Sequence, residues 1–405
     1  MSDSEIPSIN ENGVPKVKSE AAILKGVGHD WEVCEINLDE PRANEVLVRM
    51  RVAGICHSDD HFATGDAVPP PEMADMMRAF GIEPPDYFPL IGGHEGAGVV
   101  EAVGPNVTGL RPGDHVGMSF IPACGKCRWC VTGQTFICDV GASMFAKEMT
   151  TDFTPRRRLG DELLTAMTQL GTFSQYVVAS QDSVIKLDKS IPFHAAALVS
   201  CGVTTGWGSA TVSAGTEPGD TVVVIGTGGV GMNAVQGARA AGARNIVAVD
   251  PTEFKRELAP TFGATHTCAS PDAAIELVRE LTAGVMADRV IVTVGVVHGE
   301  VILAAMMLAR KGGTCVVVGM APMTEFSVPF SLADLVGNHK SLKGALYGGM
   351  NARASMPNLL SLYQSGALLL DELVTRRYQL DEINKAFDDL HQSRNIRGII
   401  EFPEA

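Results

Sequence analysis

Residues 221–242 read TVVVIGTGGVGMNAVQGARAAG, and this stretch decides how the rest of the chain can be interpreted. The first five residues are apolar or β-branched and predict a buried parallel strand, after which the chain turns on three glycines and enters an apolar helix. Gly226 permits a tight turn, Gly228 lets a pyrophosphate approach the backbone, and Gly231 lets the helix pack closely on its strand. The N-terminus of the helix would then offer free N–H groups to phosphates.

A second predicted strand, residues 245–249, ends in Asp250. A carboxylate about 20 residues beyond the glycines is placed to accept hydrogen bonds from an adenosine ribose. It would repel a 2′-phosphate, so the pattern favours NAD over NADP. The alternative is a glycine turn in another strand–helix–strand unit, with Asp250 as a solvated charge. The combination of strand, turn, helix and acidic residue disfavours that alternative.

Length and charge narrow the class of protein. The chain has 405 residues, enough for two or three domains, and a formal net charge of −15. This charge argues against nucleic acid or an anionic membrane as the main partner. No apolar run is long enough to span a bilayer, and the first residues lack the apolar core of a signal peptide, so we expect a cytoplasmic protein. Nine cysteines in such a chain indicate metal or thiol chemistry.

Four of the cysteines are closely spaced in a loop that also contains glycines. They follow the pattern Cys124-x2-Cys127-x2-Cys130-x7-Cys138, which is typical of a closed tetrahedral zinc site. The alternatives are an iron–sulfur cluster and disulfides. Ferredoxin spacing ends differently, and disulfides do not suit the expected compartment.

Three more potential metal ligands lie in short segments that are unusual in composition. Cys56 begins CHSDDH, His94 lies in the glycine-rich GGHEGAG, and Cys201 stands at the head of an apolar segment. Each residue alone has an ordinary explanation, as a core cysteine or a turn histidine. Together they form a Cys₂His set with a fourth position open, which is typical of catalytic zinc.

Alternating strands and helices between residues 203 and 346 predict a doubly wound parallel sheet. Residues 20–202 predict a β-rich domain, with the four-cysteine lobe at 119–140, and residues 347–405 predict a return to that domain. Residues 1–19 predict a loosely attached tail. We expect the active site in the cleft between the two domains.

An insertion at residues 66–90 separates two of the potential ligand segments. Its proline clusters bracket a predicted helix from Glu72 to Phe80. Either Met73, Met76 and Met77 line a substrate entrance, or an inserted surface helix packs its apolar face on the domain.

Other segments carry charged or reactive side chains with no predicted role. Residues 150–170 contain the run Arg156–Arg158 and predict a solvated loop. Cys34, Cys268 and Cys315 lie in or beside predicted strands, and we expect them to be inert core residues.

The ordered motifs GICHSD, GGHEGAG, the four-cysteine loop, VSCGVTTGWG and VIGTGGVG resemble those of the zinc-dependent alcohol dehydrogenases of the medium-chain dehydrogenase/reductase family. The resemblance runs from about residue 20 to residue 402. The stretches GVTTGWGSA, VDPTEFKRELAPTFGATHT and LTAGVMADRVIVTVG are most similar to the nicotinoprotein, NDMA-dependent members.

This resemblance implies an α/β fold, with a Rossmann domain that binds NAD and a β-rich GroES-like catalytic domain. It implies catalytic and structural zinc ions, a small alcohol or aldehyde substrate, and a homo-oligomer, dimer or tetramer. In the NDMA-dependent members NAD stays bound and is recycled by an external electron acceptor, such as the dye NDMA or mycofactocin.

The resemblance also assigns roles to residues at the metal. Cys56, His94 and Cys201 would bind the catalytic zinc, and the four clustered cysteines the structural one. Glu95 would sit behind the catalytic metal, and Asp59 would orient His94.

Further roles concern the proton, the cofactor and the substrate. Ser58 and His61 match a relay that passes the alcohol proton outward through the nicotinamide ribose, and Phe120 and Met320 match walls of the substrate pocket. The residues that match cofactor contacts are His57, Gly226, Gly228, Gly229, Val230, Gly231, Asp250, Lys255 and Arg397. His57 is a departure, because many relatives carry an arginine at that position.

Three competing functions stay open from the sequence. One is a glutathione-dependent formaldehyde dehydrogenase, which a thiol requirement would mark, and another is an ordinary NAD-exchanging alcohol or polyol dehydrogenase. The long insertion before His94 disfavours the formaldehyde and polyol enzymes. A non-catalytic NAD-binding scaffold predicts the loss of ligands or relay residues. All of those residues are present, which disfavours the scaffold.

Overall fold

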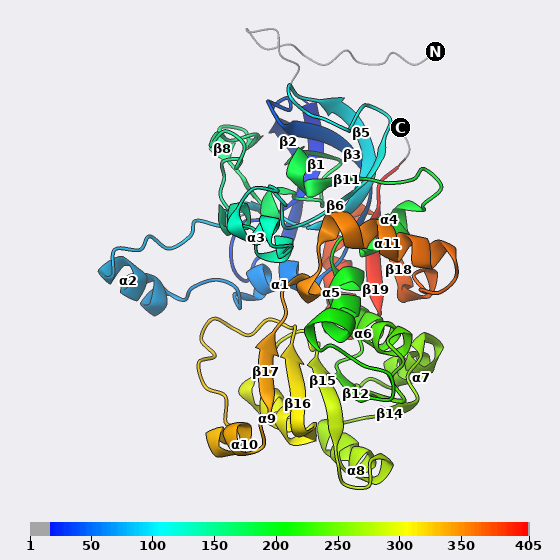
Figure 1. Cartoon of the computed structure of the whole chain (residues 1–405). Coiled ribbons are helices and arrows are strands. Elements are labelled where there is room, and N and C mark those ends of the chain that lie inside the picture. The colour runs from blue at the N-terminus through cyan, green and yellow to red at the C-terminus, as the bar shows by residue number, and fades with distance from the viewer. Residues whose placement is uncertain (1–16, 144, 404–405) are drawn as a thin grey trace.

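The computed structural model describes residues 17–143 and 145–403, which form two lobes stacked along the long axis of the molecule (Figure 1). The first lobe holds two mostly antiparallel sheets, and the second holds one parallel sheet. A single buried apolar cluster contains Val48 of the first lobe and Val224 and Met232 of the second, so the lobes share one core. Among the described residues, no helix has both the length and the apolar content needed to cross a membrane.

The first lobe is built on a seven-stranded sheet in the order β11-β6-β5-β3-β19-β18, with β10 also paired to β3, and on a six-stranded sheet in the order β8-β7-β2-β1-β4-β9. Their bounds are β1 Val17–Leu24, β2 Trp31–Leu38, β3 Glu45–Gly54, β4 Leu90–Ile91, β5 Glu95–Val103, β6 His115–Met118, β7 Arg157–Leu159, β8 Glu162–Leu163, β9 Thr165–Ala166, β10 Tyr176–Ser180, β11 Val184–Lys186, β18 Val374–Tyr378 and β19 Arg397–Glu401. Because β19 pairs with β3, the last part of the chain returns to the first lobe.

The helices of this lobe lie at its edges and at the junction. They are α1 His57–Thr64, α2 Pro71–Ala79, α3 Arg128–Val131, α4 Phe193–Leu198, α11 Ala352–Gln364 and α12 Ile383–His391. The start of α1 follows directly from β3, which places the CHSDDH segment at the end of a central strand. Because β5 pairs with β3, the GGHEGAG motif, which spans the turn before β5 and the start of that strand, lies beside the CHSDDH segment.

The second lobe is the doubly wound parallel sheet that the sequence predicts. Its strand order is β14-β13-β12-β15-β16-β17. The bounds are α5 Gly202–Gly208, β12 Thr221–Ile225, α6 Gly229–Ala240, β13 Asn245–Val249, α7 Glu253–Phe262, β14 His266–Cys268, α8 Pro271–Leu281, β15 Ala287–Val292, α9 Gly299–Leu308, β16 Ala309–Val317, α10 Leu332–Gly337 and β17 Ser341–Gly344. The strand order reverses between β12 and β15, and ligands of such sheets bind beyond the carboxyl ends of the strands at that point.

The predicted boundary of the N-terminal tail, residues 1–19, lies too far along the chain. Strand β1 begins at Val17 and pairs with β2 along its whole length, with Ser19 opposite Ile36. The sequence misled here because the strand begins with three consecutive polar residues after Val17, Lys18 to Glu20, and not with an alternating pattern. Residues 1–16 lie outside the described part of the chain.

The predicted solvated loop around Arg156–Arg158 is also wrong. The side chains of Arg156 and Glu45 are fully buried, and their charged groups lie 2.8 Å apart. Arg157 is buried as well and donates to the carbonyl oxygens of Gln169 and Val178, at 2.6 and 2.7 Å. Burial lowers the pKa of Arg157 to about 10. These arginines are buried because acceptors distant in sequence satisfy them, a condition that no local pattern reveals.

The insertion helix α2 lies apart from both lobes, on an extended arm at the left of Figure 1. None of its residues is buried, and Met76 and the following Phe80 are 51% and 78% exposed. The prediction that this helix packs its apolar face on the domain is therefore wrong. The flanking segments around Pro69 and Pro85 have no regular structure, so they act as arms that hold α2 away.

The buried pair of Glu45 and Arg156 generates a stability prediction. Replacing Glu45 by Ala leaves a buried arginine with one partner fewer, and we expect a loss of ~3–5 kcal/mol in the free energy of unfolding. Chemical denaturation followed by circular dichroism measures this loss. Glu35→Ala is the control, because its ion pair with Lys18 is exposed and should change stability little. Equal effects of the two variants would contradict this account of the burial.

Candidate catalytic metal site and cofactor cleft

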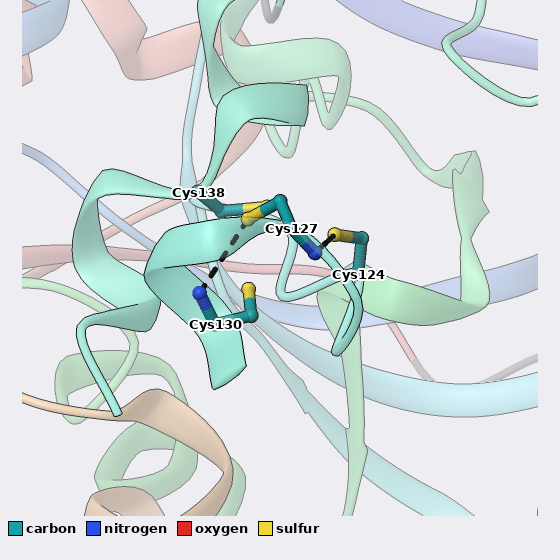
Figure 2. A group of neighbouring side chains, drawn as sticks. All are labelled: Cys124, Cys127, Cys130 and Cys138. Atoms are coloured by element: carbon teal, nitrogen blue, oxygen red, sulfur yellow. Dashed lines mark hydrogen bonds between the residues drawn. The ribbon is translucent and has the colours of Figure 1, made fainter. Parts of the chain in front are cut away.

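The four clustered cysteines meet in one small lobe around α3 (Figure 2). Their sulfur atoms all lie within 4.8 Å of one another, and all four are free thiols. The backbone N–H groups of Cys127 and Cys130 donate to the sulfurs of Cys124 and Cys127, each at 3.4 Å. Hydrogen bonds from the backbone N–H groups of Asp139 and Cys130 lower the pKa of Cys127 to about 6. Four sulfurs gathered in this way fit a closed zinc site.

The second group of potential ligands comes from three segments far apart in sequence. Donor atoms of Cys56, His94, Glu95 and Cys201 all lie within 4.8 Å of one another, and all four residues are buried. Cys56 precedes α1, His94 ends the turn before β5, and Cys201 is the N-cap residue of α5. The structure therefore brings together the predicted Cys₂His set.

The imidazole of His94 is oriented by Asp59, which is completely buried. The Asp59 carboxylate accepts a hydrogen bond of 2.7 Å from the backbone N–H of Gly93, and its other oxygen lies 3.0 Å from His94 Nδ1. Burial raises the pKa of Asp59, and the neighbouring His94 opposes that rise. Nε2 of His94 is buried and makes no hydrogen bond to any described residue, so it is available to a metal.

The two sulfurs of the set share a proton unequally. The hydrogen bond with Cys201 lowers the pKa of Cys56 well below its ordinary value, and the same contact raises the pKa of Cys201. Burial lowers the pKa of His94, but Asp59 and the Cys56 thiolate outweigh it and hold that pKa well above the usual value. A site that gathers two sulfurs and one imidazole in this way, with the imidazole nitrogen otherwise unpaired, fits zinc.

Behind this set, Glu95 forms a close ion pair with Arg397, and both side chains are buried. Burial raises the pKa of Glu95 to about 7, although Arg397 acts in the opposite direction. The aliphatic part of Arg397 also packs on Gly229, where an added Cβ would lie only 2.0 Å from its Cδ. One arginine therefore connects the metal ligands to the glycine turn of the second lobe.

The glycine turn between β12 and α6 has the geometry that its sequence predicts. Gly226 has a φ of +88°, which L residues rarely adopt. A Cβ on Gly231 would lie 1.9 Å from the carbonyl oxygen of Gly226, whereas a Cβ on Gly228 would point into open space. The space beside Gly228 is therefore free for a ligand that approaches the backbone.

Asp250 at the end of β13 is held by two backbone donors. Its carboxylate oxygens accept from the N–H groups of Thr227 and Thr252, at 2.8 and 2.9 Å. Burial lowers the pKa of the nearby Lys255, while Asp250 opposes this shift. Both side chains face the same cleft, so a ribose there would meet an acceptor and a donor.

A cleft between the lobes runs from the metal ligands to Asp250. The predicted site residues that line it are Cys56, His57, Ser58, His61, Cys201, Gly226, Gly228, Gly229, Val230, Asp250, Lys255, Met320 and Arg397. The predicted residues that lie behind this lining are Asp59, His94, Glu95, Gly231 and Phe120. Met73, Met76 and Met77 are not among the lining residues either.

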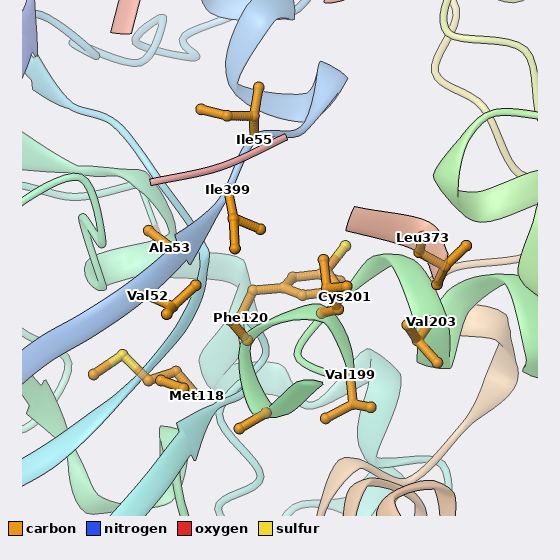
Figure 3. Close-up of a cluster of buried hydrophobic side chains, with 14 of the residues drawn as sticks. Val52, Ala53, Ile55, Met118, Phe120, Val199, Cys201, Val203, Leu373 and Ile399 are labelled. Carbon is orange, nitrogen blue, oxygen red and sulfur yellow. The ribbon is translucent and has the colours of Figure 1, made fainter. Parts of the chain in front are cut away.

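Phe120 and Cys201 belong to the buried apolar cluster drawn in Figure 3. Phe120 packs edge-on against His94 and Tyr347, with ring centroids 5.7 and 4.6 Å apart. In this structure it supports the metal ligand from behind, and its role as a wall of the substrate pocket stays a prediction.

Two family models match the chain. The alcohol dehydrogenase GroES-like domain matches residues 42–189, and the zinc-binding dehydrogenase model matches residues 229–365. The NDMA-dependent alcohol dehydrogenase of Amycolatopsis methanolica is 47% identical over 384 residues, which cover 95% of this chain and 99% of that protein. The chain belongs to the zinc-dependent alcohol dehydrogenases of the medium-chain dehydrogenase/reductase family.

Other relatives agree with this family and its fold. The S-(hydroxymethyl)glutathione dehydrogenase of Saccharomyces cerevisiae is 33% identical, over 96% of this chain and 97% of that protein. The crystal structure of benzyl alcohol dehydrogenase from Acinetobacter calcoaceticus has a TM-score of 0.83 and 28% identity, and covers 96% of this chain and 100% of that one. This dehydrogenase is thus a zinc-dependent oxidoreductase that acts on alcohols, and its two lobes are the GroES-like and Rossmann parts of the family fold.

Sequence reasoning missed two residues that line the cleft, Thr205 and Gly295, and one buried residue that packs against Phe120, Tyr347. Thr205 lines the cleft one helical turn beyond Cys201, and Gly295 touches His57, whose ring lies 2.6 Å from the position of an added Cβ. Tyr347 is buried and donates 2.7 Å to the carbonyl oxygen of Ser200. Thr205 could have been found from its helical spacing to Cys201. Gly295 and Tyr347 could not, because their positions depend on contacts between distant segments.

Substitution of Gly228 and of Gly231 by valine should affect cofactor binding and stability differently. In cofactor-free protein Gly228→Val should leave the melting temperature unchanged, but it should weaken NAD binding about tenfold or more, because its side chain would occupy the cleft. Gly231→Val should lower the melting temperature, since its side chain would strike the Gly226 carbonyl. Thermal unfolding and a cofactor-binding titration distinguish the two. Unchanged NAD binding in Gly228→Val would refute the placement of the cofactor.

Metal content tests the ligand set independently of activity. Cys56→Ser should lower bound zinc from about two ions per chain to about one, because a serine hydroxyl is a poor ligand for zinc. Cys268→Ser is the matched control, since Cys268 is buried in β14 outside both ligand groups, and it should retain both ions. Elemental analysis by mass spectrometry gives the result, and an unchanged zinc content in Cys56→Ser would contradict the assignment.

Proposed function

We propose that this dehydrogenase oxidises an alcohol with a NAD molecule that stays bound through successive turnovers, and that an external acceptor reoxidises the cofactor. The observation that carries the proposal is the 47% identity, over 95% of the chain, to a relative named NDMA-dependent. All of the expected metal ligands and relay residues are present, which supports a catalytic role. The substrate class is a small alcohol or the corresponding aldehyde.

Cys56, His94 and Cys201 hold the catalytic zinc in this proposal, and the cysteines of the α3 lobe hold a structural zinc. When bound, zinc supplies Lewis-acid activation of a hydroxyl group and NAD supplies the hydride acceptor. Asp59 keeps His94 in one orientation and tautomer. The neighbouring Glu95 stays in its ion pair with Arg397 and adds no free charge to the site.

Two residues handle the proton of the alcohol. Ser58 Oγ lies 3.7 Å from Cys56 Sγ, so its hydroxyl is placed at the metal end of the cleft, where it takes the hydrogen of the alcohol as it releases its own hydrogen outward. His61 lines the same cleft and holds the proton at a ring nitrogen. Apolar lining residues such as Val294 and Ile55 exclude water from this region.

Cofactor retention depends on contacts from both lobes. Asp250 and Lys255 bind the adenosine ribose, the glycine turn and α6 bind the pyrophosphate, and Arg397 supports that turn. Burial lowers the pKa of His57, so this residue contributes a neutral donor where many relatives have an arginine. Retention then depends on fit and burial more than on cationic charge.

The remaining features of the proposal concern organisation. Residues 20–202 and 347–405 form the catalytic domain and residues 203–346 the NAD domain. The enzyme acts in the cytoplasm as a homo-oligomer, dimer or tetramer, and its acceptor is a small redox molecule or protein. Neither nucleic acid nor a membrane is part of the proposal.

A glutathione-dependent formaldehyde dehydrogenase is the second candidate, because the Saccharomyces cerevisiae relative named for that activity is 33% identical. The lower identity and the long insertion at residues 66–90 rank it below the first. Strict dependence of formaldehyde oxidation on glutathione would favour this second candidate.

Purified protein tests the proposal directly. We expect about one NAD per chain after gel filtration, and an alcohol should generate the near-ultraviolet absorbance of reduced nicotinamide without added cofactor. NDMA should then restore the oxidised state. A cofactor-free protein that needs added NAD for turnover would instead indicate an ordinary NAD-exchanging enzyme.

A further inference from the structure

The end of helix α1 holds His61 in a fixed turn at the wall of the cleft. The His61 side chain is 2% exposed and lines the cleft. Its carbonyl oxygen accepts 2.9 Å from the N–H of Ala67, and the intervening Gly65 caps the helix with a φ of +91°. A Cβ on Gly65 would lie 2.9 Å from Val27, so neither the backbone conformation nor the space admits another residue easily. The turn therefore brings the residue after the glycine back towards His61.

That residue is Asp66, whose carboxylate faces the imidazole. Asp66 Oδ2 lies 3.2 Å from His61 Nδ1 and also accepts 2.8 Å from the hydroxyl of Thr64. Its side chain is 23% exposed, so the carboxylate lies between the buried imidazole and solvent. A carboxylate at neutral pH only accepts hydrogen bonds, so the hydrogen must belong to Nδ1. Nε2 is then the unprotonated nitrogen of the ring.

We propose that Asp66 is a positioning residue for the proton relay, which holds His61 in the Nδ1–H tautomer so that Nε2 accepts the proton. This inference rests on the proposed function. It adds Asp66, which is not one of the relay residues that the family motifs identify. When an O–H bond in the cleft breaks, an N–H bond forms at Nε2, and the positive charge on the ring is stabilised by the Asp66 carboxylate. Removing Asp66 would leave both the tautomer and that charge without support.

The other charged groups near His61 do not substitute for Asp66. Asp60 is on the same helix, but its carboxylate lies 2.7 Å from His391 Nε2. His57 is an imidazole and carries no negative charge in either protonation state. Asp66 is thus the carboxylate in hydrogen-bond reach of His61 among the residues that the structure describes.

The backbone of Asp66 is anchored separately from its side chain. Its carbonyl oxygen accepts 3.0 Å from the N–H of Met323, in the loop after Met320, which lines the cleft from the second lobe. A change of the Asp66 side chain therefore leaves this contact between the lobes in place. Side-chain variants at position 66 can test positioning without removing the turn.

The tautomer of His61 is the decisive readout, and it does not require turnover. In full-length protein loaded with zinc and NAD, ¹⁵N NMR of the imidazole nitrogens, assigned with His61→Gln, should show a proton on Nδ1. In Asp66→Ala the proton should move towards Nε2. Asp66→Asn should retain part of the tautomer preference, because an amide oxygen still accepts, but it should lose the charge.

Kinetics supply the second readout. Asp66→Ala should lower kcat about tenfold or more, with unchanged zinc content and NAD binding, and Asp66→Asn should fall between it and the parent. The control is Asp75→Ala on α2, an exposed acidic residue paired with Arg78, which should change neither readout. A proton on Nε2 in the parent, or a tautomer and kcat unaffected by Asp66→Ala, would overturn the inference. An inactive parent that keeps the Nδ1–H tautomer would overturn the proposed function and support the positioning.

Discussion

A buried carboxylate, Asp59, joins the helix that follows Cys56 to the turn that carries His94. It accepts from the Gly93 N–H at 2.7 Å and lies 3.0 Å from His94 Nδ1, with its side chain completely buried. A buried charge is costly unless it is paired, and the pairing of Asp59 with His94 favours the meeting of these two segments in the folded chain. Cys56 and His94 then come within reach of one metal as a consequence of the fold.

A second buried ion pair extends this arrangement to the glycine turn of the second lobe. Arg397 comes from β19 near the end of the chain, pairs with Glu95 behind the metal ligands, and packs on Gly229 of the second lobe. The same strand pairs with β3, which leads directly into Cys56. Metal ligands, glycine turn and the strand near the chain end are therefore mutually dependent.

The sequence predicted those features that depend only on residue type and local spacing. The β12–glycine–α6 unit and Asp250 follow from local constraints on backbone and charge, and the cysteines are recognisable because thiols are rarely placed in loops by chance. The buried Arg157, the projecting α2 and the pairing of Glu95 with Arg397 were not predictable. Arg157 and the Glu95–Arg397 pair depend on partners supplied by distant segments, whereas α2 projects because no described segment buries any of its residues.

Anomalous diffraction at the zinc absorption edge, from crystals of the protein with NAD, tests the central claim most directly. The account predicts one peak among the sulfurs of the α3 lobe, and a second about 2.3 Å from the sulfurs of Cys56 and Cys201 and about 2.0–2.1 Å from His94 Nε2. The nicotinamide ring should lie beside this second peak. A fully loaded protein with no metal between Cys56, His94 and Cys201, or with the cofactor remote from it, would contradict the account.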